Sequence, residues 1–434
     1  MLFQAVKKYS NSIALITNSD LYRYSFFELL YEKNAETLSR LEKSSIAIIG
    51  TTVDLVMLLP VLHEKVASIF LVSSSLDAEI KDKLYKQLRV SVELSLKGEK
   101  IIASPVLQDA FSCNNSTLTQ WCIATSGTTG MPKIVQHSFS SLIRTVKLDN
   151  SVGSKIIWGL TYDVTRFAGI QVFLQSFLSG STLVIPDNQD EFTNQIDFFV
   201  AMKCSALSAT PSYWRKILMH KKSNDLPLRY VTLGGEIADQ NILDNLASRF
   251  PKAKITHIYA STEVGVGFPV KDAIEGFPAA YLEGLDGIEM KIHDSYLFLK
   301  PDKVLPEVIS GKVDIDSEGY INTGDMVVLD KERVKFLGRA SGSINIGGNK
   351  VLPEEIESCI KSSGLVMNVK AYGIQSSIMG EIVAADIVPI KLENKLIKKQ
   401  VVEYCKAKLD RYKVPAFIKI VSNIELNSSG KVLR

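Results

Sequence analysis

Residues 125–133 read Thr-Ser-Gly-Thr-Thr-Gly-Met-Pro-Lys and come directly after the apolar run at residues 121–124. Such a run is typical of a buried strand, so we expect the following residues to form the loop that leaves it. The glycines let backbone N–H groups approach a ligand, the hydroxyls add donors, and Lys133 adds a positive charge. This combination suits a polyphosphate, although composition alone would favour an ordinary surface loop. The spacing is not that of a P-loop, because Pro132 precedes the lysine.

This stretch resembles the phosphate loop of the adenylate-forming superfamily, which comprises acyl- and aryl-CoA synthetases, adenylation domains of peptide synthetases, and luciferases. It matches the pattern Ser/Thr-Ser-Gly-Ser/Thr-Thr-Gly-x-Pro-Lys at every position, while Ile134 replaces the glycine that usually follows. The resemblance implies that the phosphates of ATP are bound by Thr125, Ser126, Gly127, Thr128, Thr129, Gly130 and Lys133.

Two downstream motifs of the same family concern the nucleotide and a metal ion. Residues 259–263 read Tyr-Ala-Ser-Thr-Glu and resemble the family's Tyr-Gly-x-Thr-Glu, which implies that Tyr259 stacks on adenine and that Thr262 contacts the phosphate or the acyl-adenylate. By the same resemblance Glu263 holds Mg²⁺, for which a carboxylate is a suitable hard ligand. Residues 323–325 read Thr-Gly-Asp, and the resemblance implies that Asp325 binds the ribose hydroxyls. Without the motifs, both acidic residues would be ordinary solvated loop residues.

The remaining motifs concern the adenine pocket and a mobile C-terminal part. Gly235 and Glu236 resemble a Gly-Gly-Glu turn beside the adenine, although a plain tight turn also explains the glycines. Gly338-Arg339 resembles the family's Gly-Arg before the hinge, where Ser341 replaces the usual Asp or Lys and leaves the range of the rotation open. The resemblance also implies that Gly348 lies beside the incoming thiol and that Lys431, in Ser-Gly-Lys-Val-Leu-Arg, catalyses adenylation; without the motif, Lys431 would read as part of a solvated tail.

Asp163 has two interpretations that the sequence leaves open. It lies in Thr-Tyr-Asp-Val-Thr-Arg at residues 161–166, and peptide-synthetase adenylation domains carry a similar Phe-Asp-x-Ser whose Asp meets the α-amino group of the substrate. The alternative is a helix N-cap, with Thr165 beside it.

Composition indicates an ordinary globular protein. The chain has 434 residues, of which 46% are hydrophobic and 22% charged, and a net charge of +3, so we expect neither nucleic acid nor membrane insertion. Its five cysteines are scattered without a Cys-x-x-Cys pair, which favours a reducing compartment. We read no signal peptide at the N terminus and expect a cytoplasmic enzyme that is a monomer or homodimer.

Alternating strand and helix patterns predict an α/β fold. We expect a large N-terminal AMP-binding domain of layered α/β subdomains plus a small β-barrel at residues 1–339. A small mobile α+β domain should follow at residues 340–434.

The predicted activity is that of an ATP-dependent ligase with a small carboxylic acid as substrate. It forms acyl-AMP with release of pyrophosphate and then transfers the acyl group to a thiol. The expected cofactors are ATP, Mg²⁺ and either CoA or the phosphopantetheine of an acyl carrier protein. One alternative is a free-standing amino-acid adenylation enzyme that loads a carrier protein, favoured by Asp163. Another is a degenerate nucleotide-binding or regulatory protein without turnover, disfavoured because the expected functional residues are all present: Lys133, Glu263, Asp325, Arg339 and Lys431. The sequence does not identify the acid.

Overall fold

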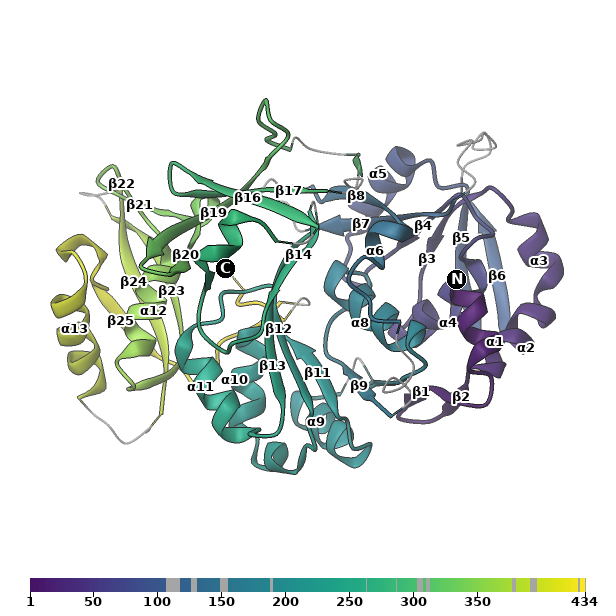
Figure 1. Cartoon of the computed structure of the whole chain (residues 1–434), viewed down its shortest axis with the longest axis horizontal. Helices are drawn as coiled ribbons and strands as arrows, with labels where there is room; N and C mark the ends of the chain where they lie inside the picture. Colours follow the sequence, from purple (N-terminus) through teal and green to yellow (C-terminus); the bar gives the residue numbers. More distant parts are fainter. Residues whose placement is uncertain are drawn as a thin grey trace.

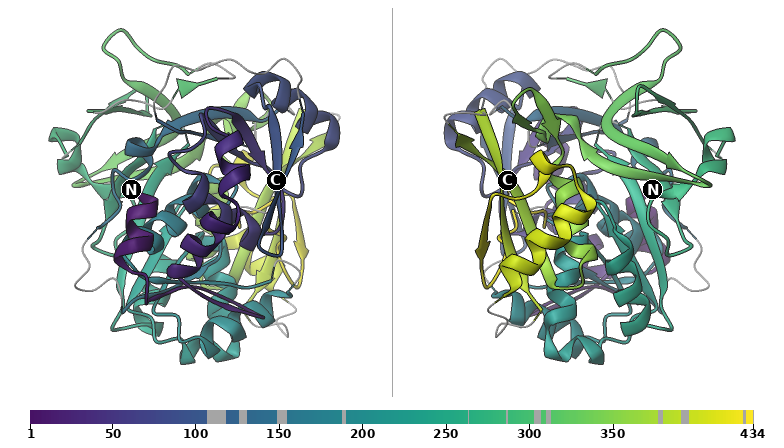
Figure 2. Two further views of the ribbon diagram at one scale, coloured as in Figure 1. Left: turned by 90° about the vertical axis from the view of Figure 1, so that its right-hand side faces the viewer. Right: turned by 90° about the vertical axis from the view of Figure 1, so that its left-hand side faces the viewer.

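The computed structural model of the chain describes residues 1–106, 118–125, 131–148, 155–187, 190–262, 264–285, 287–302, 307–309, 313–376, 380–390, 396–427 and 430–433. These residues form two large sheets, a five-stranded sheet and a further sheet in the C-terminal part. The N-terminal helices lie at one end of the molecule and the C-terminal helix α13 at the other (Figure 1). Figure 2 shows these two ends face on. The expected α/β fold, with a large N-terminal and a small C-terminal domain, is confirmed.

The first large sheet has eight strands in the order β14-β13-β12-β11-β9-β10-β1-β2. The strands from β13 to β1 run parallel, and β14 and β2 are antiparallel at the two edges. The carboxyl ends of the parallel strands meet along one edge, which is where ligands commonly bind in such sheets. The strands are β1 (Ile13–Thr17), β2 (Leu21–Arg23), β9 (Ile157–Leu160), β10 (Thr182–Ile185), β11 (Ala206–Ala209), β12 (Tyr230–Gly234), β13 (Lys254–Ser261) and β14 (Gly265–Val270).

The second large sheet has seven strands in the order β18-β8-β7-β4-β3-β5-β6. Its central strands β7, β4, β3 and β5 are parallel, and β7 and β8 form an antiparallel hairpin. The strands are β3 (Ser45–Ile48), β4 (Ser68–Leu71), β5 (Val92–Lys97), β6 (Lys100–Pro105), β7 (Gln120–Thr125), β8 (Lys133–Ser138) and β18 (Glu307–Val308).

Helices cover the faces of these sheets because parallel strands need crossover connections. A mainly apolar core lies between the two large sheets and includes residues of α1, α2, α4 and α8. Helix α4 is buried at every position from Leu55 to Leu62 and is capped by Thr51 and Asp54. The helices of this part are α1 (Leu2–Lys8), α2 (Ser25–Lys33), α3 (Ala35–Arg40), α4 (Thr52–Leu62), α5 (Ala78–Leu88), α6 (Phe139–Leu142), α8 (Phe167–Leu178), α9 (Phe192–Ala201), α10 (Pro211–Met219) and α11 (Gln240–Arg249), with 3₁₀ turns η1 (Lys221–Asp225) and η2 (Ala279–Glu283).

A five-stranded antiparallel sheet stands where we expected the small β-barrel, in the order β15-β20-β19-β17-β16. It has its own core around Phe268, Phe277 and Leu299. The strands are β15 (Phe277–Pro278), β16 (Ile288–His293), β17 (Tyr296–Pro301), β19 (Ile321–Asp330) and β20 (Arg333–Arg339).

The C-terminal domain packs two helices on a sheet, with a core made only of residues from Ile344 onward. This separate core supports the predicted boundary after Arg339, which stays a prediction. The elements are η3 (Ala340–Gly342), β21 (Ile344–Ile346), β22 (Asn349–Val351), α12 (Pro353–Ser362), β23 (Val366–Ser376), β24 (Gly380–Pro389), α13 (Ile397–Lys408), η4 (Arg411–Lys413) and β25 (Phe417–Ile420).

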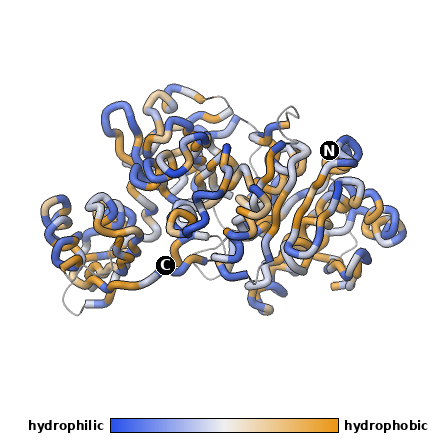
Figure 3. Tube along the Cα trace, turned by 90° about the horizontal axis from the view of Figure 1, so that it is seen from below, coloured by the Kyte–Doolittle hydropathy of each residue, from blue (hydrophilic) through white to orange (hydrophobic). Residues whose placement is uncertain are grey.

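Hydrophobic residues are concentrated along the strands of the interior, and hydrophilic ones in the outer loops and helices (Figure 3). No helix in the described part of the chain is long and apolar enough to cross a membrane. After β25 the chain runs back from the C-terminal domain to the middle of the molecule, where it ends (Figure 1).

Candidate active site

The two ends of the predicted phosphate loop are fixed by a β-hairpin. Thr125 ends β7 and Lys133 begins β8, and the two residues are paired across the hairpin. Oγ1 of Thr125 donates a hydrogen bond to the Lys133 carbonyl at 3.5 Å. The predicted loop residues Ser126, Gly127, Thr128, Thr129 and Gly130 lie outside the described residues. Lys133 thus projects from the strand that begins where the loop ends.

Arg166 contacts the strand that leads into this loop, a contact that sequence reasoning missed. Its Nη1 donates to the carbonyl of Ala124 at 2.8 Å, one residue before the loop. Its Nε is buried and has no hydrogen-bond partner among the described residues. No sequence motif marks a lone arginine before a helix. Its contact with Ala124 could therefore be found only from the three-dimensional structure.

Lys431 lies against the backbone of Gly235. Gly235 follows β12 at the carboxyl edge of the first sheet and has φ +81°, a conformation that favours glycine. A Cβ at Gly235 would lie 3.1 Å from Cε and 3.8 Å from Nζ of Lys431. Both residues are exposed, so the lysine reaches solvent-accessible space at the sheet edge. The fold therefore brings together two predicted site residues that are far apart in the sequence.

Glu236, the next residue of the turn, contacts backbone rather than open space. Its Oε2 accepts a hydrogen bond from the Ser212 N–H at 2.9 Å, and its Oε1 accepts one from the Val432 N–H at 2.9 Å. Both described partners are main-chain groups, one at the start of α10 and one in the C-terminal tail. The predicted contact of Glu236 with the nucleotide stays a prediction.

Tyr259, Asp325 and Arg339 form one cluster. The Tyr259 hydroxyl donates to Oδ2 of Asp325, and Nε of Arg339 donates to Oδ1 at 2.8 Å. The Tyr259 ring lies parallel to the rings of Phe268 and Phe336, with centroids 5.3 and 5.2 Å away. Burial, and after it the charge of Asp325, raises the pKa of Tyr259 well above its usual value, so the hydroxyl stays protonated. The predicted adenine-stacking and ribose-binding residues are thus in contact.

The metal-binding prediction falls largely outside the described residues. Thr262 follows β13 directly and is half buried, whereas Glu263 is not described. No group of three or more His, Cys, Asp or Glu side chains in the described part could hold a metal ion. A magnesium site that the phosphates of ATP complete needs fewer protein ligands than such a group, so the donor set fits.

His137 is a second residue that sequence reasoning missed. It is fully buried on β8, with Nδ1 3.3 Å from Oγ of Ser141 and its ring centroid 5.3 Å from that of Phe167. Burial lowers the pKa of His137 to about 4, so the imidazole is neutral. A packed neutral histidine behind the phosphate-loop strand has no sequence signal of its own.

The carboxylate of Asp163 accepts hydrogen bonds from a residue of its own turn. Its Oδ1 accepts hydrogen bonds from the N–H and Oγ1 of Thr165, each at 2.8 Å, and Oγ of Ser73 lies 3.5 Å from its Oδ2. The N-cap position of α8 belongs to Arg166, so Asp163 closes the turn before the helix and is not its N-cap. The N-cap interpretation is therefore wrong, although Thr165 is the partner that we expected.

Gly348 is not brought to the other predicted residues. It lies in the exposed turn between β21 and β22, with φ +89°, and its N–H donates to Oδ1 of Asn345 at 3.1 Å. A Cβ at Gly348 would meet no atom within 4 Å. Ser341, at the predicted hinge, is exposed in η3. The C-terminal domain thus presents Lys431 to the sheet edge, and Gly348 to solvent.

Comparison with known proteins identifies the family. The model of the AMP-binding enzyme family matches residues 45–307, and that of the AMP-binding enzyme C-terminal domain matches residues 355–431. The chain is 26% identical over 377 residues to a 2-succinylbenzoate–CoA ligase of Listeria monocytogenes, covering 82% of this chain and 78% of that protein. It is 27% identical over 368 residues to a long-chain-fatty-acid–CoA ligase of Mycobacterium tuberculosis, covering 78% and 70%.

Solved structures share the fold. o-Succinylbenzoate CoA synthetase from Bacillus subtilis, in complex with its acyl-adenylate intermediate, matches with a TM-score of 0.73 and 20% identity over 100% of this chain and 96% of that one. ATP-bound MatB from Rhodopseudomonas palustris matches with a TM-score of 0.76 and 16% identity over 100% and 97%. The predicted enzyme class, an AMP-forming acid–thiol ligase, is confirmed, and the chain belongs to the AMP-binding enzyme family.

Proposed function

We propose that this ligase activates a compact carboxylic acid with MgATP and passes the acyl group to the thiol of CoA. The observation that supports this most is the position of Lys431 against Gly235, at the carboxyl edge of the parallel strands. A lysine at that edge lies where the negative charge of the reacting phosphate is expected. The nucleotide cluster of Tyr259 and Asp325 begins from the next strand, β13.

The first step joins the acid to AMP. A carboxylate oxygen bonds to the α-phosphorus, the bond to the β-phosphate breaks, and pyrophosphate leaves. Negative charge grows on the phosphoryl oxygens, so positioned cations supply most of the catalysis. Lys431 stabilises this charge, and Lys133 with its loop holds the β- and γ-phosphates. Glu263 would hold Mg²⁺, which neutralises phosphate charge when it is bound.

The second step transfers the acyl group. The thiol sulfur bonds to the carbonyl carbon, AMP leaves with its phosphate, and the thiol proton passes to solvent. A rotation of the C-terminal domain withdraws Lys431 and brings Gly348 to the thiol. The separate core of that domain supports such a rigid-body motion.

The position of the Tyr162 side chain favours a compact acid over a long acyl chain as the substrate. Strand β11 lies between β9 and β12, and Tyr162 follows β9 but donates a hydrogen bond to the Gly234 carbonyl at the end of β12, at 3.3 Å. Its buried side chain therefore crosses the carboxyl end of β11, beside the turn that Lys431 contacts. A long unbranched chain entering between these strands would have to displace the ring.

An amino acid is the alternative substrate, and it depends on Asp163. Because Oδ1 already accepts two hydrogen bonds from Thr165, an α-amino group would have to bind Oδ2, near Ser73. Loss of activity toward an amino acid in Asp163→Ala would favour this alternative. Unchanged activity would leave Asp163 as a residue of the turn.

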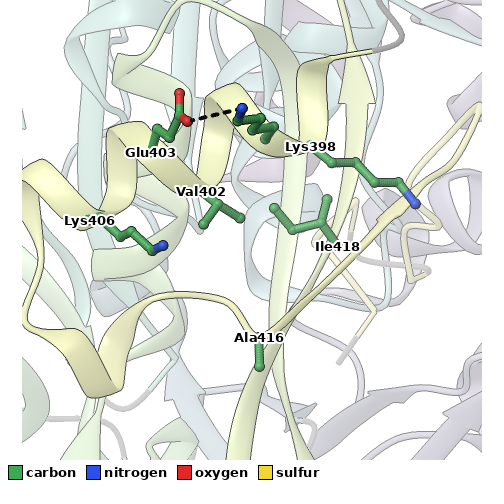
Figure 4. Close-up of a pocket in the computed structure, with 7 residues that line it drawn as sticks. Lys398, Val402, Glu403, Lys406, Ala416 and Ile418 are labelled. Carbon is green, nitrogen blue, oxygen red and sulfur yellow. Dashed lines mark ion pairs between the residues drawn. The ribbon is translucent and has the colours of Figure 1, made fainter.

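A carrier protein is the alternative acceptor, and one surface supports it. A shallow groove of about 360 Å³ lies between α13 and β25, lined by Lys398, Lys399, Val402, Glu403, Lys406, Ala416 and Ile418 (Figure 4). Lys399 lies 3.9 Å from Glu403, and the lining of the groove includes three lysines and this single acid. The exposed Phe417 and Ile420 adjoin it on β25. Such a basic groove with apolar neighbours suits an acidic protein partner.

The test is acid-dependent ATP–pyrophosphate exchange over short, aryl, long-chain and amino acids, followed by acyl transfer to CoA or to a carrier protein. We expect exchange with compact unsubstituted acids and thioester formation with CoA. Transfer to carrier protein that weakens with salt and with Lys406→Glu, but not with Lys203→Glu on the N-terminal domain, would instead establish the carrier alternative. The cytoplasmic location and the monomeric or dimeric state stay predictions.

A further inference from the structure

The residues that carry Lys431 form a small closed hairpin. Leu426 and Val432 are paired as an isolated bridge, and the Leu433 N–H donates to the Glu425 carbonyl at 3.0 Å. The Asn427 N–H donates to the Lys431 carbonyl at 2.8 Å, and Oδ1 of Asn427 accepts from the Lys431 N–H at 3.1 Å. Lys431 therefore moves with this hairpin as a unit.

Two side chains of the N-terminal domain hold the hairpin in place. Oε1 of Glu236 accepts the Val432 N–H at 2.9 Å, across a separation of 196 residues. Oγ1 of Thr210 donates to the Gly430 carbonyl. The two contacts fall on the residues immediately before and after Lys431, so they fix the main chain on both sides of the catalytic lysine.

Thr210 and Glu236 together form a dock for the hairpin, and the N-terminus of α10 orders both side chains. Thr210 is the N-cap of the helix and also accepts the Tyr213 N–H at 3.1 Å, while the Ser212 N–H donates to Oε2 of Glu236. The Ser212 N–H therefore orients the Glu236 carboxylate through Oε2, which leaves Oε1 to accept the Val432 N–H. Hydrogen bonds to a charged acceptor are about twice as strong as neutral ones, so the bond to Val432 is the stronger of the two tail contacts.

We propose that Glu236 is a positioning residue for adenylation. It acts through Lys431, because its carboxylate accepts the Val432 N–H and so holds the main chain next to the lysine. This rests on the proposed function of Lys431 and gives Glu236 a role different from the nucleotide contact expected from its motif. The bond exists only while the tail is docked. Its loss should therefore slow acyl-AMP formation and spare the thiol step, for which Lys431 withdraws.

The experiment compares Glu236→Gln with Glu425→Gln, which removes the same charge from an exposed side chain of the same tail. With the best acid from the exchange panel, Glu236→Gln should lower the exchange rate about ten- to a hundredfold, since one charged acceptor is lost. The KM for ATP should stay within about threefold, and thioester formation from supplied acyl-AMP within about twofold. Glu425→Gln should match the unmodified enzyme in both half-reactions.

A double variant separates positioning from nucleotide binding. If Glu236 acts through Lys431, then adding Glu236→Gln to Lys431→Ala should slow exchange no further. Additive losses, a rise confined to the KM for ATP, or equal slowing of both half-reactions would overturn the proposal.

Hydrogen exchange at the Val432 amide tests the dock without turnover. The dock is supported if the Val432 amide is protected in the unmodified protein and loses this protection in Glu236→Gln at an unchanged thermal midpoint. This result would support the dock even if no acid turned over. In that case only the proposed function would fail. Equal exchange at Val432 in the two proteins would overturn the dock itself.

Discussion

The hydroxyl of Tyr259, on β13, donates a hydrogen bond to Oδ2 of Asp325, on β19. Arg339 is the last residue of β20, and its Nε donates a hydrogen bond to the other oxygen of the same carboxylate. The residue expected to stack on adenine thus orients the residue expected to bind ribose. Arg339 directly precedes the predicted hinge, so this cluster is adjacent to the point where we expect the C-terminal domain to rotate.

Tyr259→Phe should weaken AMP binding about tenfold, because Asp325 loses one orienting hydrogen bond. The ring contacts with Phe268 and Phe336 do not need the hydroxyl, so the fold should be kept. Calorimetric titration with AMP measures the change. Tyr320→Phe is the matched control, because its exposed hydroxyl also donates to a carboxylate, that of Glu289 at 2.8 Å, away from the cluster. An unchanged dissociation constant in Tyr259→Phe would contradict the ribose role of Asp325.

Lys431→Ala should lower ATP–pyrophosphate exchange about a hundred- to a thousandfold, since a preorganised charge at the phosphoryl group is lost. Thioester formation from supplied acyl-AMP should be unaffected. The two half-reactions are measured separately, with the exposed Lys419→Ala of the same domain as control. Equal loss in both half-reactions would show that Lys431 is needed for more than the first step.

The sequence predicted those parts of the site that rest on local motifs. It placed the phosphate loop between a strand and Lys133, because a short-range pattern determines this arrangement. It could not assign Glu236 to the tail, since that contact spans 196 residues and depends on how the C-terminal domain is seated. The sequence could not decide between the two interpretations of Asp163, because the start of α8 at Phe167 is a boundary that local propensity does not fix.

Tyr162→Ala should shift the preference toward longer acids, because it removes the ring that crosses from β9 to the end of β12. We expect the ratio of kcat/KM for a long-chain acid over a short one to rise at least tenfold, which corresponds to relief of a steric block of about 1.4 kcal/mol. Competition between two acids of different length gives this ratio directly. Tyr162→Phe should leave the ratio unchanged, since the bulk remains. A shift in Tyr162→Phe as large as in Tyr162→Ala would show that the hydroxyl, not the bulk, selects the acid.

Arg215→Met should destabilise the protein by about 3–5 kcal/mol, because it leaves the buried carboxylate of Asp239 without its nearest partner. Nη2 of Arg215 lies 2.5 Å from Oδ2 of Asp239, and Nζ of Lys361, on α12 of the C-terminal domain, lies 3.5 Å from the same oxygen. Urea denaturation measures the loss. Lys222→Met breaks an exposed pair with Asp197 and should cost about 0–1 kcal/mol. Equal costs for the two variants would contradict this account.

The buried Asp239 carboxylate also predicts that the fold loses stability in acid. Burial alone would raise the pKa of Asp239, but the charges of Arg215 and Lys361 outweigh it and lower the pKa below its usual value. A lowered pKa stabilises the fold above the unfolded value, near 4, and this stabilisation is lost as the pH falls through the folded value.

His63→Phe should make stability less dependent on pH between 6.5 and 5. His63 is buried at the end of α4, with its ring centroid 4.0 Å from that of Phe139, and burial lowers its pKa from 6.5 to about 4. Between these values only the unfolded chain takes up the proton, so stability is complete above pH 6.5 and falls as the pH drops. From pH 6.5 to 5 the loss is on the order of 2 kcal/mol for His63 and the same for His137, whose pKa is lowered alike.

Urea midpoints measured across this range should therefore fall less steeply in His63→Phe than in the unmodified protein. Phenylalanine keeps the packing on Phe139 and carries no titrating group, so the neutral-pH midpoint should change little. His293→Phe is the control, because that side chain is 70% exposed and its variant should keep the full slope. If His63→Phe keeps the full slope as well, then burial of His63 does not set the acid sensitivity, and other buried histidines such as His137 must account for it.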